Sequence, residues 1–244
     1  MWVYIWKERQ REPGDKTVVY YKFNWDIKDY SWNWYDLTGS PTINNWYITL
    51  SGNRLYNSSS SISWDSSSNY TVVAWLRNFN TSYSNSLYRC QAWVLSAYAS
   101  DISGSFPLTY LGIANGVAST PVWTVMGTNA LWTTYADGSW NNTTIMVDGN
   151  TWTCVIVTLD RANNVTYFYK NWNTSYVFAK TGAWTSSDSP TTWIQVWIVW
   201  GTSYWGNARY YFGDIGEIIL EKKKWTTDEI SSYYNNTKSL YGIT

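Results

Sequence analysis

The chain has 244 residues, with 17 basic and 17 acidic side chains and no histidine. A formal charge of zero with no basic stripe argues against a nucleic-acid partner. No apolar run reaches the ~20 residues of a membrane span. The first residues, MWVYIWKERQREPG, lack the apolar stretch of a secretory signal, so none is expected.

Strand signals begin at Thr17, and no linker-like run divides the chain after it. We therefore predict an N-terminal arm over 1–16 and one domain over 17–244, a length that suits a single large all-β unit.

Segments rich in β-branched and aromatic residues predict five long strands: 17–23, 70–77, 151–160, 165–170 and 210–221. Shorter candidates are 48–50, 89–95, 108–113, 122–126, 130–135, 143–147, 175–180 and 194–199. Many short strands separated by Ser-, Asn- and Gly-rich turns indicate an all-β fold, an antiparallel two-sheet β-sandwich. The period-two pattern of 70–77 predicts a sheet covered on one face and lightly exposed on the other.

One helix is predicted, close to the C-terminus. Thr226 and Glu229 have the spacing of a capping box, and the acidic first turn complements the helix dipole. An apolar stripe should pack on the sandwich, formed by Ile230, Tyr233, Tyr234 and Leu240.

Several of the 20 tryptophans occupy positions where the surrounding sequence favours glycine. In DYSWNWYDL and KNWNT they follow asparagine or serine in turns that require positive φ angles, which a bulky side chain disfavours. We predict that UGA codons, read as glycine in the native organism, encode Trp32, Trp34, Trp46, Trp172, Trp193, Trp197 and Trp200. Trp75 and Trp152 fit strand positions and are expected to be genuine. The alternative is a tryptophan-rich protein that stacks sugars on these rings.

Five pieces occur in the order of a known superfamily: VVYYKF, DIKDYSWNWYDLTG, SNYTVVAWLR, NTWTCVIVTLDRANNVTYFYKNWN and FGDIGEIILEKKKWTTDEISSYY. Together they resemble the laminin-G-like, concanavalin A-like jelly-roll superfamily of lectins and glucanases. The resemblance implies a jelly-roll sandwich. Two positions depart from the pattern, with Gly216 where an aspartate is usual and Cys154 where a histidine is usual.

Glucanases of this superfamily use carboxylates at alternate positions of one strand, so that the acids share a face. The nearest candidates are Asp214, Glu217 and Glu221. The odd spacing of Asp214 and Glu217 predicts opposite faces, and without histidine no Ser/His or Cys/His pair can form. We therefore expect no enzymatic activity, and a glycoside hydrolase is the least favoured function.

The resemblance also implies a calcium ion near the first turn, with Asp29 and Glu217 at the positions of its carboxylate ligands. The alternative is that Asp29 caps the turn through its own side chain.

Cys90 and Cys154 allow at most one disulfide bridge. The unbroken strand pattern around Cys154 favours a buried thiol instead.

Aromatic side chains on loops suit the apolar faces of sugars, with polar groups at the rim. The candidates are Tyr83, Tyr88, Tyr204, Trp205 and Arg209. The resemblance and the missing catalytic pattern predict a non-catalytic carbohydrate-binding or adhesion module, with a glycan as partner, at the cell surface or on a virion. The alternative is a structural virion, tail-fibre or surface-assembly protein whose arm docks on neighbouring subunits.

Overall fold

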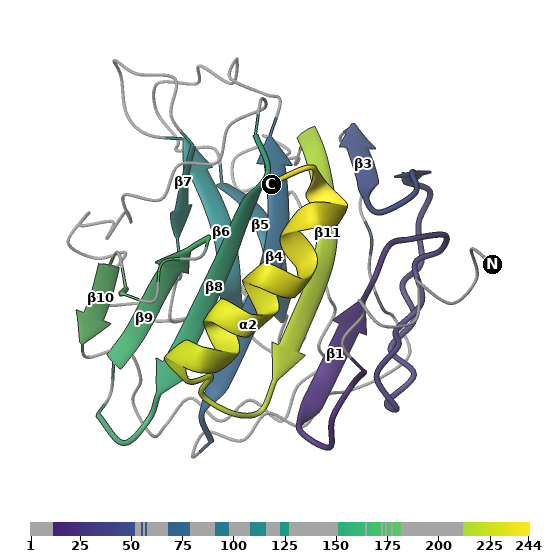
Figure 1. The fold of residues 1–244 in the computed structure, drawn as a ribbon. Coiled ribbons are helices and arrows are strands. Elements are labelled where there is room, and N and C mark those ends of the chain that lie inside the picture. The colour runs from purple at the N-terminus through teal and green to yellow at the C-terminus, as the bar shows by residue number, and fades with distance from the viewer. Residues whose placement is uncertain are drawn as a thin grey trace, which may run out of the picture.

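The computed structural model describes residues 12–51, 55, 57, 68–78, 91–97, 108–115, 123–126, 151–163, 165–171, 173, 175–176, 178–181 and 212–244. In this part the chain is an antiparallel β-sandwich with one α-helix near the C-terminus, as the sequence predicts (Figure 1). No helix among these residues is long and apolar enough to cross a membrane. The predicted strands at 130–135, 143–147 and 194–199 lie outside the described residues, as do residues 1–11 of the arm.

The larger sheet has eight strands in the order β10-β9-β8-β4-β11-β3-β2, with β1 also pairing with β11. Their bounds are β1 Thr17–Tyr21, β2 Thr42–Ile43, β3 Ile48–Ser51, β4 Tyr70–Asn78, β8 Thr153–Asp160, β9 Val165–Lys170, β10 Phe178–Thr181 and β11 Phe212–Glu221. The smaller sheet, β5-β6-β7, comprises Gln91–Ala97, Leu108–Asn115 and Trp123–Met126. Every strand pairing between these elements is antiparallel.

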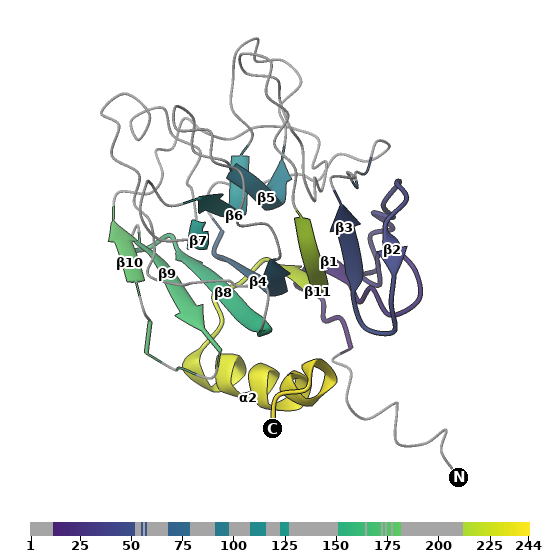
Figure 2. The same cartoon turned by 90° about the horizontal axis from the view of Figure 1, so that it is seen from above.

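The sandwich has three layers (Figure 2). The smaller sheet lies over one face of the larger sheet, and helix α2 (Thr227–Thr237) lies over the other. This arrangement corrects the expectation for β4, whose second face was predicted to be lightly exposed. All of Thr71–Leu76 is buried, because α2 covers that face.

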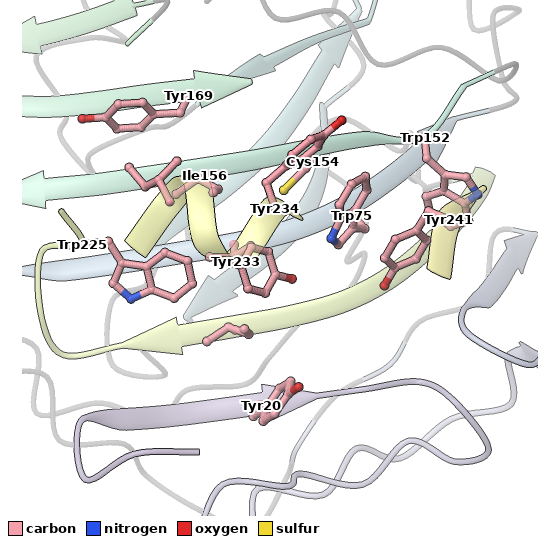
Figure 3. Packing of buried hydrophobic residues seen from close by; sticks show 13 residues of the cluster. Tyr20, Trp75, Trp152, Cys154, Ile156, Tyr169, Trp225, Tyr233, Tyr234 and Tyr241 are labelled. Atoms are coloured by element: carbon pink, nitrogen blue, oxygen red, sulfur yellow. The ribbon is translucent and has the colours of Figure 1, made fainter. Parts of the chain in front are cut away.

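The layer between α2 and the larger sheet is packed with aromatic side chains, and we call it the helix-side core (Figure 3). Trp75 of β4 stacks on Tyr234 and Tyr241, with ring centroids 5.5 and 4.3 Å away. Both tryptophans expected to be genuine belong to this layer, since Trp75 is fully buried and Trp152 is 9% exposed. The buried members are Tyr20, Val73, Trp75, Trp152, Cys154, Ile156, Tyr169, Ile219, Trp225, Ile230, Tyr233, Tyr234 and Tyr241.

The helix begins as predicted. The Thr226 side chain accepts from the Glu229 N–H, and the Glu229 carboxylate accepts from the Thr226 N–H, which completes the capping box. Three members of the predicted stripe, Ile230, Tyr233 and Tyr234, are buried, and Leu240 is partly buried against the helix-side core. Capping and burial of one face therefore act together, since a helix this short is marginal without packing.

Candidate functional site

The three acids of β11 lie on the same face of the larger sheet, which contradicts the sequence prediction for Asp214 and Glu217. The pairing of β11 with β4 shifts between Ile215 and Ile218, so Gly216 and Glu217 together stand opposite Trp75. This β-bulge adds one residue to β11 and restores Glu217 to the face of Asp214. The alternation rule failed because it assumes an uninterrupted ladder.

Asp214 is held by side chains of the two neighbouring strands. Its Oδ2 accepts from Nε of Arg77 at 2.9 Å and from a second guanidinium nitrogen, while Oδ1 accepts from Thr49 Oγ1 at 2.6 Å. The Arg77 guanidinium also lies over the rings of Trp152 and Tyr47, 5.0 and 5.6 Å from their centroids. This carboxylate therefore ties β3, β4 and β11 together, and at 2% exposure it is closed to solvent.

Glu217 and Glu221 face the helix and the segment that leads into it. The Tyr233 hydroxyl donates to the Glu217 carboxylate at 2.7 Å, and the Trp225 indole N–H donates to Glu221. Thr17 Oγ1 donates to the other oxygen of Glu221 at 3.1 Å. Both acids are buried, and each anchors α2 or β1 to β11.

Burial shapes the chemistry of the groups around Glu217. It raises the pKa of the Tyr233 hydroxyl well above 10.0, and the negative charge of Glu217 adds to this rise. Burial, and then the same charge, also raises the pKa of the Cys154 thiol well above 9.0. Cys154 is a free buried thiol, as the strand pattern favoured. Neither group is poised as a nucleophile or a base at neutral pH.

Asp29 organises the first turn from inside. Its Oδ1 accepts from the N–H groups of Tyr20 and Ser31, both at 2.9 Å. Its Oδ2 accepts from Ser31 Oγ at 2.6 Å and from the Tyr35 N–H at 2.9 Å. The bond to the residue two positions ahead is an Asx turn, so the capping role weighed for Asp29 is present.

Asp29 and Glu217, which the resemblance matches to a calcium site, do not lie together as ligands of one ion. The backbone of Tyr21 pairs with Asp29 on one side and with Ile218 on the other, so β1 separates Asp29 from β11 by two strand spacings, roughly 10 Å. The groups that contact the Asp29 carboxylate are hydrogen-bond donors, which compete with a cation for its oxygens. Among the described residues no three acids, cysteines or histidines cluster around a metal position. The calcium ion stays a prediction, and these contacts do not favour Asp29 and Glu217 as its joint ligands.

The first turn also carries exposed tryptophans. Trp25, Trp32 and Trp34 are 67%, 74% and 76% exposed. Trp34 has a φ of 62°, in the left-handed region that favours glycine, whereas Trp32 does not. The conformational argument for a glycine therefore holds at Trp34 and does not hold at Trp32 or Trp46. Trp172, Trp193, Trp197 and Trp200 lie outside the described residues.

The five predicted sugar-binding residues, Tyr83, Tyr88, Tyr204, Trp205 and Arg209, all lie outside the described residues. The strands that anchor their segments are described. The first segment leaves the sheet after Asn78 of β4, and the second enters it before Phe212 of β11. Asn78 pairs with Gly213, and Phe212 pairs with Ser51 at the end of β3. The two segments are therefore anchored side by side at one end of the larger sheet, which we call the loop end.

No family model and no curated protein matches the chain. Solved structures with a similar fold include domain 4 of AbnA, a GH43 extracellular arabinanase from Geobacillus stearothermophilus, in complex with arabinotriose. The TM-score is 0.53 at 15% identity, over 90% of this chain and 98% of that domain. Trypanosoma rangeli sialidase in complex with sialic acid has a TM-score of 0.60 at 10% identity, over 95% of this chain and 34% of the sialidase chain. The botulinum neurotoxin serotype D binding domain has a TM-score of 0.55 at 12% identity, over 91% of this chain and 52% of that chain. The chain therefore has the β-sandwich fold that these domains share.

Proposed function

We propose that this protein is a non-catalytic carbohydrate-binding module that recognises a glycan or cell-surface polysaccharide outside the cell or on a virion. The observation that carries the proposal is the fold shared with arabinanase domain 4, a domain solved with arabinotriose and matched over 98% of its length. The likeness is one of fold, so the sugar and the binding residues must be tested directly.

The state of the β11 acids supports a non-catalytic role. A retaining or inverting glycosidase needs two carboxyl groups that flank the scissile bond and meet the substrate. Asp214, Glu217 and Glu221 share a face, but α2 covers it and they are only 2%, 6% and 1% exposed. Each carboxylate accepts a hydrogen bond that links β11 to another part of the fold, from Arg77, Tyr233 and Trp225 respectively. Turnover of a laminarin-type substrate that disappears in Glu217→Gln would overturn this part of the proposal.

The loop end is the proposed place of binding. The central strands of the larger sheet are covered on both faces, by the smaller sheet on one and by α2 on the other (Figure 2). The strand ends that anchor the two segments are adjacent, since Asn78 pairs with Gly213, and this supports the proposal that Tyr83, Tyr88, Tyr204, Trp205 and Arg209 contribute to one site. Aromatic faces with a cationic rim are the composition expected of a sugar site.

The test is a glycan array followed by affinity electrophoresis in gels that contain the polysaccharides found to bind. We expect the Tyr83→Ala/Tyr88→Ala and Tyr204→Ala/Trp205→Ala variants to lose retardation. A control on the exposed edge strand β2, Ile43→Ala, should keep it. If the unaltered protein binds no glycan and no polysaccharide, the proposed function is wrong.

The alternative, a structural virion or surface-assembly protein, depends on the arm at 1–16, of which residues 12–16 are described. It stays a prediction, and a neighbourhood of tail or capsid genes would favour it.

A further inference from the structure

An aromatic and cationic strip lies on the outer surface of β9, away from the loop end. The ring of Tyr176, which is 54% exposed, is 5.1 Å from the ring of Tyr167, with the planes tilted by 52°. The Nζ of Lys224 lies over the ring of Tyr167, 5.0 Å from its centroid. The sequence predicts strands over 165–170 and 175–180, which contain the two tyrosines, and aromatic residues of strands usually pack, so neither tyrosine is a predicted site residue.

The strip is held in place by the strands beneath it. Tyr167 pairs with Thr158 of β8, and Asp160, at the end of the same strand, accepts from Lys224 Nζ at 2.7 Å. The Asp160 carboxylate also accepts from the Asn163 side chain at 2.9 Å. The hydrogen bond with Asp160 raises the pKa of Lys224, so the ammonium stays charged at neutral pH. The amine therefore keeps a defined position beside the tyrosines while about a third of the side chain remains exposed.

The Lys224 end of the strip and the loop end lie at opposite ends of β8. Thr153, the first residue of β8, pairs with Leu76 close to the end of β4, on the side where the loop segments are anchored. Asp160, the last residue of β8, pairs with Val165 at the start of β9. An eight-residue strand separates the two ends by roughly 25 Å.

We propose that Tyr176, Tyr167 and Lys224 form a second saccharide-binding platform. It would take a sugar whose apolar ring face stacks on Tyr176 and whose hydroxyl or carboxylate oxygen accepts a hydrogen bond from Lys224. An exposed aromatic ring with an amine at its rim has the chemistry of a sugar site, which combines an apolar contact area with a few placed polar groups. This inference rests on the proposed function, and it adds a position that the loop residues do not supply.

Because Tyr176 is exposed, removing its ring creates no buried cavity, so a loss of binding can be separated from a loss of stability. The variants are Tyr176→Ala, Tyr176→Phe and Lys224→Met. The matched control is Trp25→Ala, which removes a similarly exposed aromatic ring beside β1, at the opposite side of the sheet from β9. Thermal unfolding of each variant verifies the fold. The probes are arabinan as a neutral polysaccharide and polygalacturonate as an acidic one, each in affinity electrophoresis.

We expect Tyr176→Ala to weaken retardation about tenfold, the usual scale for loss of an aromatic anchor. Tyr176→Phe and Trp25→Ala should keep it, and Lys224→Met should weaken it on the probe that the protein binds. If Lys224→Met weakens retention on arabinan, the acceptor for Lys224 is a hydroxyl, and if it weakens retention on polygalacturonate alone, the acceptor is a carboxylate. If Tyr176→Ala binds like the unaltered protein while the loop variants lose binding, the platform is wrong and the proposed function stands. If the unaltered protein is retained on no glycan at all, both are wrong.

Discussion

The backbone N–H of Glu217 donates a hydrogen bond to the hydroxyl oxygen of Tyr241, 24 positions later, at 2.8 Å. Tyr241 ends the short 3-10 helix η2 (Lys238–Tyr241), and its ring lies directly over Gly216. The β-bulge of β11 and the C-terminal segment therefore depend on one another. The bulge frees the N–H that Tyr241 binds, and the missing side chain at Gly216 leaves room for the ring.

Gly216→Ala should destabilise the protein by about 1–3 kcal/mol, as overpacking of a tight core does. A Cβ at this position would lie 2.5 Å from the Tyr241 ring, closer than real contacts allow. Urea unfolding measures the loss. Gly14→Ala is the control, because no atom lies within 4 Å of a Cβ there. Equal stabilities of the two variants would show that the ring does not lie where the structure has it.

Tyr233→Phe should lower the free energy of unfolding by about 1–3 kcal/mol, because it removes a hydrogen-bond donor to a buried carboxylate. Glu217→Gln in the Tyr233→Phe background should recover part of the loss, since a neutral amide costs less to bury than an unsupported charge. A double-mutant cycle by urea unfolding measures the coupling between the two side chains. Simple additivity of the two changes would contradict a direct bond.

Trp34→Gly should stabilise the protein by about 1 kcal/mol, because Trp34 has a φ of 62° and its ring is 76% exposed. The matched control is Trp25→Gly, since Trp25 is similarly exposed but does not have a positive φ. That change should give no gain. Thermal unfolding compares the two. The same argument predicts a UGA codon at Trp34 and UGG codons at Trp75 and Trp152, and the nucleotide sequence tests this directly.

The Asp160–Lys224 pair should stabilise the protein across the middle of the pH scale and lose its contribution at both ends. The hydrogen bond from Lys224 lowers the pKa of Asp160, so its contribution is complete above the unfolded value of about 3.9 and disappears as pH falls through the lower folded value. The pKa of Lys224 is raised, so its contribution is complete below about 10.4 and disappears as pH rises through the higher folded value. Lys224→Met should lower the free energy of unfolding by about 0.2–1 kcal/mol between these limits, since Lys224 is about a third exposed and solvent screens the pair. A pH series of thermal unfolding that runs parallel to that of the unaltered protein would contradict the pairing.

Cys154 should resist alkylation in the native protein at pH 8 and react at once in 6 M guanidinium. The thiol is fully buried and its pKa is raised, so little thiolate forms and reagents do not reach it. Mass spectrometry of peptides after timed iodoacetamide treatment separates Cys154 from Cys90. Rapid native labelling of Cys154 would show that the helix-side core opens readily.

The amino-acid sequence alone was sufficient for the fold class, most strand positions and the C-terminal helix. These are local properties. Strand segments such as 70–77 and 165–170 are rich in β-branched and aromatic residues, and the capping box at Thr226 and Glu229 acts within one turn of helix. Composition and capping depend only on neighbours in the chain, so they can be read before any tertiary contact is known.

The faces of the β11 acids, the role of Asp29 and the strip on β9 required the tertiary structure. One inserted residue in the β11 ladder placed Glu217 on the face of Asp214, and no local pattern signals a bulge that contacts a ring 24 positions away. Asp29 collects donors from Tyr20 and Tyr35 as well as from its own turn. Tyr176 and Lys224 are 48 positions apart in the sequence and meet through Tyr167 only because β9, β8, β4 and β11 pair in that order. Contacts of this kind depend on register and chain crossing, which residue-by-residue patterns do not encode.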